Sequence, residues 1–337
     1  MFEIKENISL KNYNSFGLDV KSSYFVECFS VQDIIDFLNI HQNMELPLMV
    51  LGGGSNVLFS KDFEGYVLRP CIKGIDVVEE TENDVVVRVG AGEDWDEFVK
   101  YCVDQGWGGI ENLSLIPGNV GTCPIQNIGA YGVEVKDVIT FVETINIRDL
   151  ILKSYTNSEC KFGYRNSIFK TNLKGKQIIT YVSFRLSKKP IFKLDYGNLV
   201  NELKRFENIN LQTIRKAVIN IRESKLPKPE EIGNAGSFFK NPYIEIEKFE
   251  KIKDDYSDIP CYKLGNNLVK IPAGWLVEKA GYKGKRDGNA GVHDKQALVI
   301  VNYGNASGQE ILHLARNIQQ TVIIMFGIEL EMEVNVV

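Results

Sequence analysis

The amino-acid sequence predicts an α+β fold with a glycine-rich N-terminal half and a separate C-terminal lobe. About half of the 29 glycines fall between Gly52 and Gly132, in two dense clusters. Strand-like runs prevail up to residue 186, whereas helical and strand patterns are mixed beyond it. A chain of 337 residues, 44% apolar and 25% charged, is typical of a globular protein with two or three domains.

Three patterns predict the elements around the first glycine cluster. An apolar run over 48–51 precedes this cluster, and alternating residues over 85–89 indicate a strand. An amphipathic helix is expected to begin near Asp94. One face of that helix collects the apolar residues Trp95, Phe98, Val99, Cys102 and Val103.

The remaining elements follow in order. Strands are expected over 138–142 and 178–184, and the charges and proline at 188–190 end this run. Beyond it, 211–222 reads as a helix and 297–301 as a short buried strand. A capping box at Ser307, Gly308, Gln309 and Glu310 precedes a last helix with Ile311, Leu314, Ile318 and Val322 on one stripe.

Charge and composition exclude several classes of protein. The net charge is −5 with no basic block, so we expect no nucleic-acid partner. No apolar run approaches the roughly 18 residues needed to cross a bilayer. Glu3 and Glu6 stand where a signal peptide has basic residues, which predicts a cytoplasmic enzyme or ligand-binding protein. The six scattered cysteines and three histidines lack ligand spacing, so no metal is expected.

The glycine clusters predict main chain that approaches a phosphate. The first reads Gly-Gly-Gly-Ser-Asn from Gly52, and the second runs from Ile116 to Gly132. A P-loop needs Gly-Lys-Ser/Thr, and a Rossmann fingerprint must open a helix, whereas 56–59 continues as a strand. Either cluster alone could be a hairpin turn. Two together favour an extended dinucleotide lying across both.

Two polar segments carry candidate reactive side chains. Arg165, in the segment 161–167, can hold a carboxylate with two hydrogen bonds, although most arginines form surface ion pairs. Ser237 stands between glycine-rich main chain and two phenylalanines, and is expected to be a buried hydroxyl. It lacks a nucleophile elbow and an identifiable histidine base, so proton donation fits better than acylation.

Further candidates lie near the C-terminus and beside polar turns. Alternation over 330–334 predicts a strand with Glu331 and Glu333 on one face, and a solvated strand edge is the simple alternative. Tyr196 and Tyr262 are close to polar turns, where ordinary packing is equally possible. Cys123, beside the second glycine cluster, is interpreted as a packing residue.

Taken together, these segments resemble the UDP-N-acetylenolpyruvoylglucosamine reductases, flavoenzymes that complete UDP-N-acetylmuramate for bacterial peptidoglycan. The block from Gly233 to Pro242 is highly specific, whereas the first glycine cluster alone would indicate only the wider vanillyl-alcohol-oxidase-type FAD fold. The resemblance covers nearly the whole chain in the same order. Its segments are 14–17, 52–56, 116–118, 124–132, 164–165, 233–242 and 330–334.

The resemblance implies an α+β, vanillyl-alcohol-oxidase/PCMH-type FAD-binding fold with a C-terminal α+β substrate-binding domain. A first FAD-binding subdomain would span 1–70 and be joined by a C-terminal strand in 325–337. A second would span 71–210, and the substrate-binding domain 211–324. Ala130-Tyr131-Gly132 and the segment with Tyr262 resemble the type I subfamily, which has a mobile tyrosine lid. We expect a monomer.

The resemblance also implies two cofactors and their contacts. FAD would be bound, and NADPH would reduce it and leave before the substrate enters. The expected FAD-binding residues are Gly52, Gly53, Gly54, Ser55, Asn56, Pro117, Gly118, Thr122, Gln126, Asn127, Gly129 and Tyr131.

The implied substrate is a UDP-sugar enolpyruvyl ether, which receives a hydride from the reduced flavin. Arg165 and Glu333 would hold and polarise its carboxylate, with Glu333 in a neutral form, and Ser237 would donate the proton. The other expected substrate-binding residues are Tyr164, Tyr196, Lys225, Asn241, Tyr262 and Gln296.

Two other functions stay open from the residues. An FAD-dependent oxidase of the same cofactor fold could act on another sugar or alcohol. A sugar-nucleotide-binding protein with a vestigial flavin site would have lost Arg165, Ser237 or Glu333, and all three are present.

Overall fold

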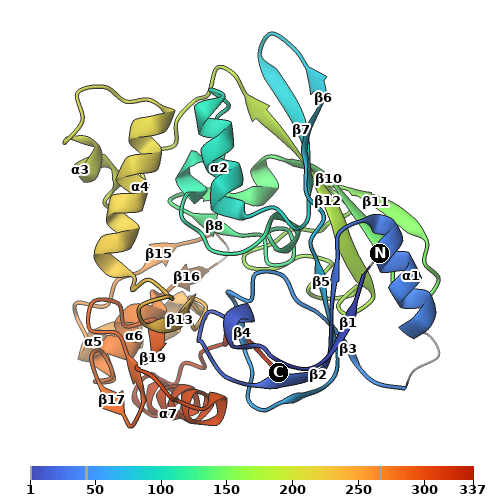
Figure 1. The fold of residues 1–337 in the computed structure, drawn as a ribbon. Coiled ribbons are helices and arrows are strands. Elements are labelled where there is room, and N and C mark those ends of the chain that lie inside the picture. Colours follow the sequence, from blue (N-terminus) through green and yellow to red (C-terminus); the bar gives the residue numbers. More distant parts are fainter. Residues whose placement is uncertain (1, 42–44, 266) are drawn as a thin grey trace. The chain divides into compact units, whose positions relative to one another are not determined.

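The computed structural model (Figure 1) describes residues 2–41, 45–265 and 267–337. The chain divides into two compact units. Both units are discontinuous in sequence. The first comprises Met1–Ile8, Ser22–Gly53 and Glu64–Ser224, and the second comprises Ser9–Lys21, Gly54–Phe63 and Lys225–Val337.

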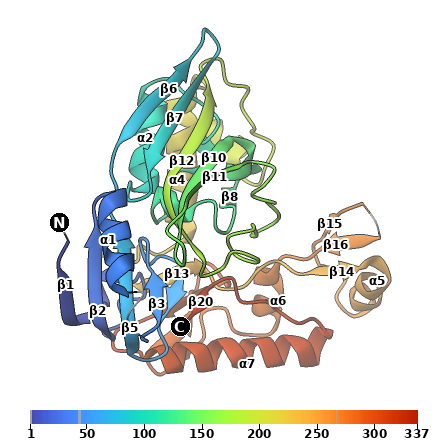
Figure 2. The same ribbon diagram turned by 90° about the vertical axis from the view of Figure 1, so that its right-hand side faces the viewer.

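The first unit begins with a four-stranded sheet in the order β1-β2-β5-β3. Its strands are β1 (Ile4–Ser9), β2 (Lys21–Cys28), β3 (Leu48–Val50) and β5 (Phe63–Pro70). Helix α1 (Val31–His41) lies against it, because Ile34, Phe37 and Leu38 pack on Val26 and Leu68 of the sheet (Figure 2).

A second, five-stranded sheet carries most of the first unit. Its order is β11-β10-β12-β7-β6, and all neighbouring strands are antiparallel. The strands are β6 (Ile75–Glu80), β7 (Asp84–Gly90), β10 (Ile139–Asn146), β11 (Leu152–Thr156) and β12 (Gln177–Ser187). The valines at 85, 87 and 89 are buried on one face, as the period of two in a strand requires.

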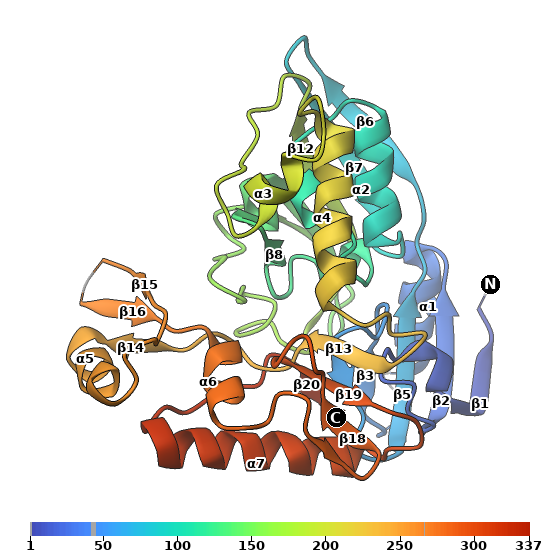
Figure 3. The ribbon, with the colours of Figure 1, turned by 90° about the vertical axis from the view of Figure 1, so that its left-hand side faces the viewer.

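Helices pack on this second sheet. Asp94 caps α2 (Trp95–Asp104), accepting a hydrogen bond from the Glu97 N–H, and the five apolar residues expected on one face are all buried. Helix α4 (Leu211–Lys225) runs beside α2, and Gln212 donates to the Val103 carbonyl (Figure 3). Short elements complete the unit: α3 (Leu199–Leu203), η2 (Glu111–Leu113), η3 (Val120–Thr122), η4 (Val135–Asp137), β8 (Gly129–Ala130) and β9 (Val133–Glu134).

The second unit is built around a four-stranded sheet in the order β13-β19-β18-β17. The strands are β13 (Gly233–Ser237), β17 (Arg286–Asp287), β18 (Ala290–Val292) and β19 (Val299–Asn302). Helix α7 (Gly308–Phe326) packs on this sheet through the expected apolar stripe, and its capping box at Ser307 and Glu310 is formed (Figure 3).

Smaller pieces complete the second unit. A three-stranded sheet, β14-β16-β15, lies with helix α5, and a two-stranded parallel sheet joins β20 to β4. These elements are η1 (Lys11–Tyr13), β4 (Val57–Leu58), β14 (Tyr243–Glu245), α5 (Ile246–Asp255), β15 (Tyr262–Lys263), β16 (Leu268–Lys270), α6 (Ala273–Lys279) and β20 (Asn335–Val336). The C-terminal strand thus returns to residues just after the first glycine cluster.

Two parts of the fold differ from the sequence-based expectation. The expected strand over 330–334 is wrong, since the described segment makes only an isolated bridge, Met332 with Phe239, before β20 begins. Helix α4 falls almost wholly in the first unit, whereas the expected substrate-binding domain begins at 211. The division of the chain into three functional domains stays a prediction.

Candidate FAD and substrate site

The two glycine clusters touch within the first unit. A Cβ on Gly52 would overlap the Thr122 side chain, and a Cβ on Gly53 would lie 2.9 Å from the Gly118 Cα. Glycine is therefore required at 53, because its neighbour there is main chain that cannot move aside. The expectation that both clusters serve one ligand requires them to be neighbours, and they are.

The rest of the first cluster belongs to the second unit. Gly54 has φ +65°, and a Cβ there would collide with the Tyr13 carbonyl. Asn56 donates through Nδ2 to the carbonyl oxygen of Glu333, 3.2 Å away. The Asn335 N–H in turn donates to the Asn56 carbonyl. The first glycine cluster is thereby bonded to the segment that carries Glu333.

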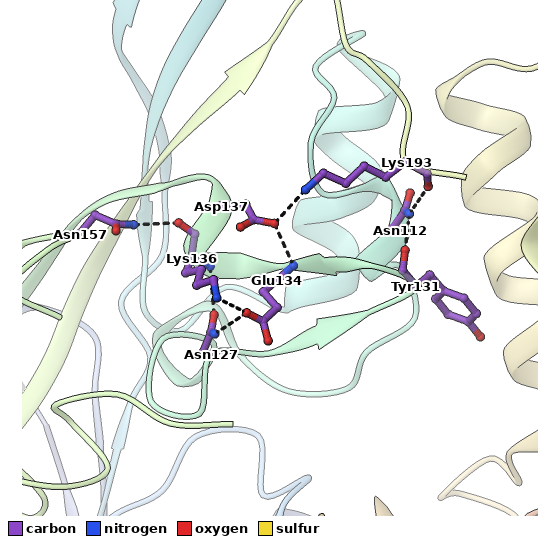
Figure 4. A network of polar contacts seen from close by, with 8 residues as sticks. All are labelled: Asn112, Asn127, Tyr131, Glu134, Lys136, Asp137, Asn157 and Lys193. Carbon is purple, nitrogen blue, oxygen red and sulfur yellow. Dashed lines mark hydrogen bonds and ion pairs between the residues drawn. The ribbon is translucent and has the colours of Figure 1, made fainter. Parts of the chain in front are cut away.

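The second cluster is a series of turns that ends in the hairpin β8-β9. The hairpin-turn alternative is therefore partly right for this cluster. Asn127 and Tyr131 adopt positive φ angles of 46° and 48°, which favour tight changes of direction. Asn112 is fully buried and donates to the carbonyls of Tyr131 and Lys193 (Figure 4). These two bonds link the hairpin to the segment that contains Lys193.

Burial changes the pKa values of two ionisable groups near these turns. Burial raises the pKa of the Tyr131 hydroxyl, and the nearby Arg222 partly opposes this. Burial also raises the pKa of the Cys123 thiol well above its ordinary range. Cys123 is 1% exposed and packs in the core of the first unit, where burial disfavours the thiolate form.

Arg165 lies in a tight turn of the first unit. Gly163 and Asn166 exchange two main-chain hydrogen bonds across this turn, and Arg165 has φ +51°. Its Nη2 donates to the Gly129 carbonyl at 2.7 Å. The guanidinium is therefore attached to the second glycine cluster, and its partner there is a carbonyl. Tyr164 precedes it, with its ring centroid 5.4 Å from the guanidinium carbon.

Ser237 and Glu333 are neighbours within the second unit. The Glu333 N–H donates to the Phe238 carbonyl at 2.8 Å, and the Lys240 N–H donates to the Glu331 carbonyl at 2.9 Å. These bonds pair the segment after Ser237 with the segment that contains Glu333. The expected buried hydroxyl is wrong, because Ser237 is exposed.

The two phenylalanines, in contrast, enter the core. Phe238 and Phe239 are almost fully buried. The ladder between β13 and β19 shifts register between Asn234 and Ser237, and Gly236 has φ +68°. This irregularity explains why Ser237 is turned outward while the next two side chains are buried.

The two C-terminal glutamates differ in environment. The Glu331 side chain is 71% exposed and forms an ion pair with Lys240, as the solvated-edge alternative expects. Glu333 is half-buried. The two glutamates expected on one strand face therefore differ in exposure, while Leu330 and Val334 of the alternate set are buried.

The expected substrate-binding residues lie in several elements. Tyr196 is 45% exposed, and its Cβ lies 3.4 Å from the place that a Cβ on Gly132 would take. Lys225 is the exposed last residue of α4. Asn241 accepts a hydrogen bond from the N–H of Ala273 at the start of α6. Tyr262 is 51% exposed on β15, and Gln296 is half-buried next to β19.

Other expected FAD-binding residues are placed as follows. Pro117 is exposed, and Gly118 after it has φ +126°. Thr122 donates through Oγ1 to the Asn119 carbonyl. Ser55 and Gln126 are half-buried.

Among the described residues, no group of three or more His, Cys, Asp or Glu could hold a metal ion, and no helix there is long and apolar enough to span a membrane.

Sequence reasoning missed three residues that hold these segments. Asn112 carries no periodic signal, and Ser167 lies in the segment 161–167, where Arg165 is the expected reactive residue. Asn14 is buried and forms three hydrogen bonds to Leu10 and Leu18. Only Asn14 carried a signal that could have found it, its place in the segment 14–17 that resembles the family, because a polar residue there often fixes a turn.

Comparison with known proteins decides the family. The chain is 48% identical to the UDP-N-acetylenolpyruvoylglucosamine reductase of Flavobacterium johnsoniae, over 99% of this chain and 100% of that protein. It is also 48% identical to the enzyme of the same name from Bacteroides fragilis, over 98% and 99%. The chain belongs to the UDP-N-acetylenolpyruvoylglucosamine reductase family.

Family models and a solved structure of the same reductase also match this chain. Residues 228–337 match the model of the UDP-N-acetylenolpyruvoylglucosamine reductase C-terminal domain, and residues 22–150 match an FAD binding domain. The crystal structure of the reductase from Thermus caldophilus covers 100% of this chain and 99% of that one, with a TM-score of 0.70 and 23% identity. The expected vanillyl-alcohol-oxidase-type fold with a C-terminal α+β domain is confirmed.

The residues of this reductase fit FAD. The matched FAD-binding region contains both glycine clusters, and Gly52 and Gly53 of the first lie against Thr122 and Gly118 of the second. Their glycines allow main chain to come close to a pyrophosphate, which no side chain at 53 would permit. The expectation of FAD as the cofactor is confirmed; the individual contacts stay predictions.

Proposed function

We propose that this chain reduces UDP-N-acetylglucosamine enolpyruvate to UDP-N-acetylmuramate, a step of peptidoglycan precursor synthesis, with NADPH as the electron donor. The observation that carries the proposal is the identity of 48% with enzymes named for this activity over 99% of the chain. A partial match could reflect a shared cofactor domain alone. Identity over the whole length includes the C-terminal domain, which the wider flavoprotein fold does not share.

FAD, when bound, supplies the hydride transfer from NADPH to the enol ether. The chain's own residues then have to bind the carboxylate of the substrate and move a proton. We assign the carboxylate to Arg165, whose permanently charged guanidinium can donate two parallel hydrogen bonds. We assign Glu333 to the same carboxylate in its neutral form, because an ionised glutamate would repel it.

Ser237 is the proposed proton donor to the carbon next to the carboxylate. A hydroxyl is a weak acid, but it can protonate a strongly basic carbanion-like centre. Its exposed position at the end of β13 leaves it accessible to a substrate. The hydrogen bond from Glu333 to Phe238 supports a joint role, since it keeps the two proposed groups on adjacent segments.

The diphosphate and sugar are assigned to Tyr164, Tyr196, Lys225, Asn241, Tyr262 and Gln296. The exposed tyrosines Tyr196 and Tyr262 offer hydroxyl donors, which suits phosphate oxygens. FAD is assigned to Gly52 through Asn56 and to the second cluster, with Pro117, Gly118, Thr122, Gln126, Asn127, Gly129 and Tyr131. We further propose a monomer with three functional domains, located in the cytoplasm, where NADPH and nucleotide sugars are formed.

The test is NADPH oxidation by the purified yellow protein, with and without UDP-N-acetylglucosamine enolpyruvate. We expect turnover only with the enolpyruvyl sugar nucleotide. Yellow protein with no such turnover would refute the substrate, and protein that cannot be reconstituted with FAD would refute the cofactor site. Rapid reoxidation of the reduced flavin by oxygen, with release of peroxide, would favour the oxidase alternative.

A further inference from the structure

Two segments of the first unit, 125–129 and 163–167, are joined by three side-chain hydrogen bonds. Asn127 donates through Nδ2 to the Gly163 carbonyl at 2.9 Å. Ser167 donates through Oγ to the Ile125 carbonyl at 2.6 Å. Arg165 donates through Nη2 to the Gly129 carbonyl at 2.7 Å. The sequence motifs for the cofactor and for the carboxylate-binding arginine therefore form one bonded structure.

Asn127 is the centre of this structure. Its side chain is fully buried, and Nδ2 donates to both the Gly163 carbonyl and Glu134 Oε2. Its Oδ1 accepts from the Lys136 N–H (Figure 4). Both N–H groups of the amide are thus used by the protein, and these bonds leave neither for a ligand. A contact of Asn127 with FAD would have to come from its main chain.

The turn that holds Arg165 needs such support. Arg165 has φ +51°, a left-handed conformation that is unfavourable for a residue with a side chain. A strained turn persists only when its surroundings hold it in place. The Gly163 carbonyl closes this turn with Asn166 and accepts from Asn127 as well. Ser167, buried at 1% exposure, anchors the chain just after the turn.

We propose that Asn127, assisted by Ser167, is a positioning residue that sets the direction of the Arg165 guanidinium toward the substrate carboxylate. This inference rests on the role proposed for Arg165. It gives Asn127 a function beyond contact with the flavin. The second glycine cluster and the Arg165 turn should also move together. A displacement of 125–129 would be passed to Gly163 before Arg165 and to Ser167 after it, through the two hydrogen bonds.

The experiment uses the full-length flavoprotein and separates its two half-reactions. Asn127→Ala removes the bonds to Gly163 and Glu134, and Ser167→Ala removes the second anchor. We expect both variants to keep FAD and to be reduced by NADPH at the wild-type rate. Reoxidation by the enolpyruvyl substrate should slow by about 100-fold for Asn127→Ala, because a displacement of about 1 Å costs that much at a catalytic group.

Asn157 provides a matched control. It is an exposed asparagine in the same network, and its side chain donates to the Lys136 carbonyl (Figure 4). It also donates to the Ile139 carbonyl. Asn157→Ala removes two hydrogen bonds of similar length without touching the Arg165 turn. We expect it to leave both half-reactions unchanged. If Asn127→Ala does not fold, Ser167→Ala alone, which leaves the Asn127 bonds in place and removes only the bond to the Ile125 carbonyl, carries the test.

A double-mutant cycle with Arg165→Ala distinguishes positioning from general damage. If Asn127 acts through Arg165, Asn127→Ala should have no further effect on reoxidation once the guanidinium is gone. Independent, multiplied losses would overturn the inference, as would loss of FAD from Asn127→Ala. If Arg165→Ala itself left reoxidation unchanged, the role proposed for Arg165 in binding the carboxylate would be refuted. The cycle therefore distinguishes failure of that role from failure of the positioning role of Asn127.

Discussion

The main-chain N–H of Glu333 donates a 2.8 Å hydrogen bond to the carbonyl oxygen of Phe238, the residue that follows Ser237. A second bond, from the Lys240 N–H to the Glu331 carbonyl, lies on the other side of the Phe239–Met332 bridge. Two residues far apart in sequence are thereby held on neighbouring segments of the second unit. The pairing is made by main chain, so substitutions at either side chain should leave it intact.

Ser237→Ala should therefore separate the two half-reactions without unfolding the protein. NADPH should still bleach the flavin, whereas reoxidation by the enolpyruvyl substrate should slow by about 10²–10⁴-fold, the usual contribution of a positioned proton donor. Stopped-flow absorbance of the flavin measures both steps. Ser257, also exposed in the second unit, offers Ser257→Ala as a control with no expected effect. An equal loss in both steps would exclude the proton-donor role.

Gly52→Ala should weaken FAD binding, and Thr122→Ser should restore it. A Cβ on Gly52 would overlap the Thr122 Cγ2, while the next nearest atom is 3.6 Å away. Serine lacks that methyl group but keeps the hydroxyl. Gly53→Ala should not be rescued, because its nearest neighbour is the Gly118 Cα at 2.9 Å.

The flavin-to-protein absorbance ratio after gel filtration measures this effect. Gly265 is the control glycine, since no atom lies within 4 Å of a Cβ built there. Gly265→Ala should retain full FAD. If Gly52→Ala and its Thr122→Ser double variant bind FAD equally, the close packing of the two clusters has no part in cofactor binding.

Tyr262→Phe should raise KM for the enolpyruvyl substrate and leave kcat nearly unchanged, because we assign its hydroxyl to binding alone. Tyr243 is a matched control in the same small sheet. Both tyrosines pair with Lys270, one from each side of β16, and both are about half exposed. Tyr243→Phe should leave KM unaltered in steady-state assays. A collapse of kcat at constant KM in Tyr262→Phe would contradict the assignment.

Asp96 should contribute pH-dependent stability to the first unit. Burial alone would raise the pKa of Asp96, but hydrogen bonds from Arg215 and from the Leu115 N–H, with the charges of Arg215 and Arg222, outweigh it and lower this pKa. A carboxyl whose pKa is lower in the folded state stabilises that state above its unfolded pKa, about 3.9. The contribution is lost as the pH falls through the lower, folded-state pKa.

Asp96→Asn should therefore lower Tm at pH 7 and have progressively less effect below about pH 4. Loss of hydrogen bonds to a charged group costs about 2 kcal/mol, or roughly 4–8 °C in a unit of this size. Asp104→Asn, at the exposed end of the same helix, should leave Tm unchanged. A constant difference in Tm between pH 7 and pH 3 would exclude the ionic contribution. Calorimetry at both pH values is the measurement.

Helices whose signals lie within a few residues of one another were predictable from the sequence. Helix α2 follows from the Asp94 cap and its apolar face, and α7 follows from its capping box, because these signals involve residues within a few positions of one another. The strand expected over 330–334 was not found, since that segment bonds to Phe238 and Lys240 rather than to a regular ladder. Ser237 was expected inside and is exposed, because a register shift in β13 turns it outward.

The sequence by itself determined the family, the cofactor, and the glycines and polar residues that are candidates for the chemistry. These depend on residue types in fixed local order, which a single chain displays directly. Only the tertiary structure decided that Gly53 packs on Gly118, that Glu333 is bonded beside Ser237, and that Asn127 and Ser167 hold the Arg165 turn. Such contacts join segments distant in sequence, and their hydrogen bonds and packing exist only once the chain has folded.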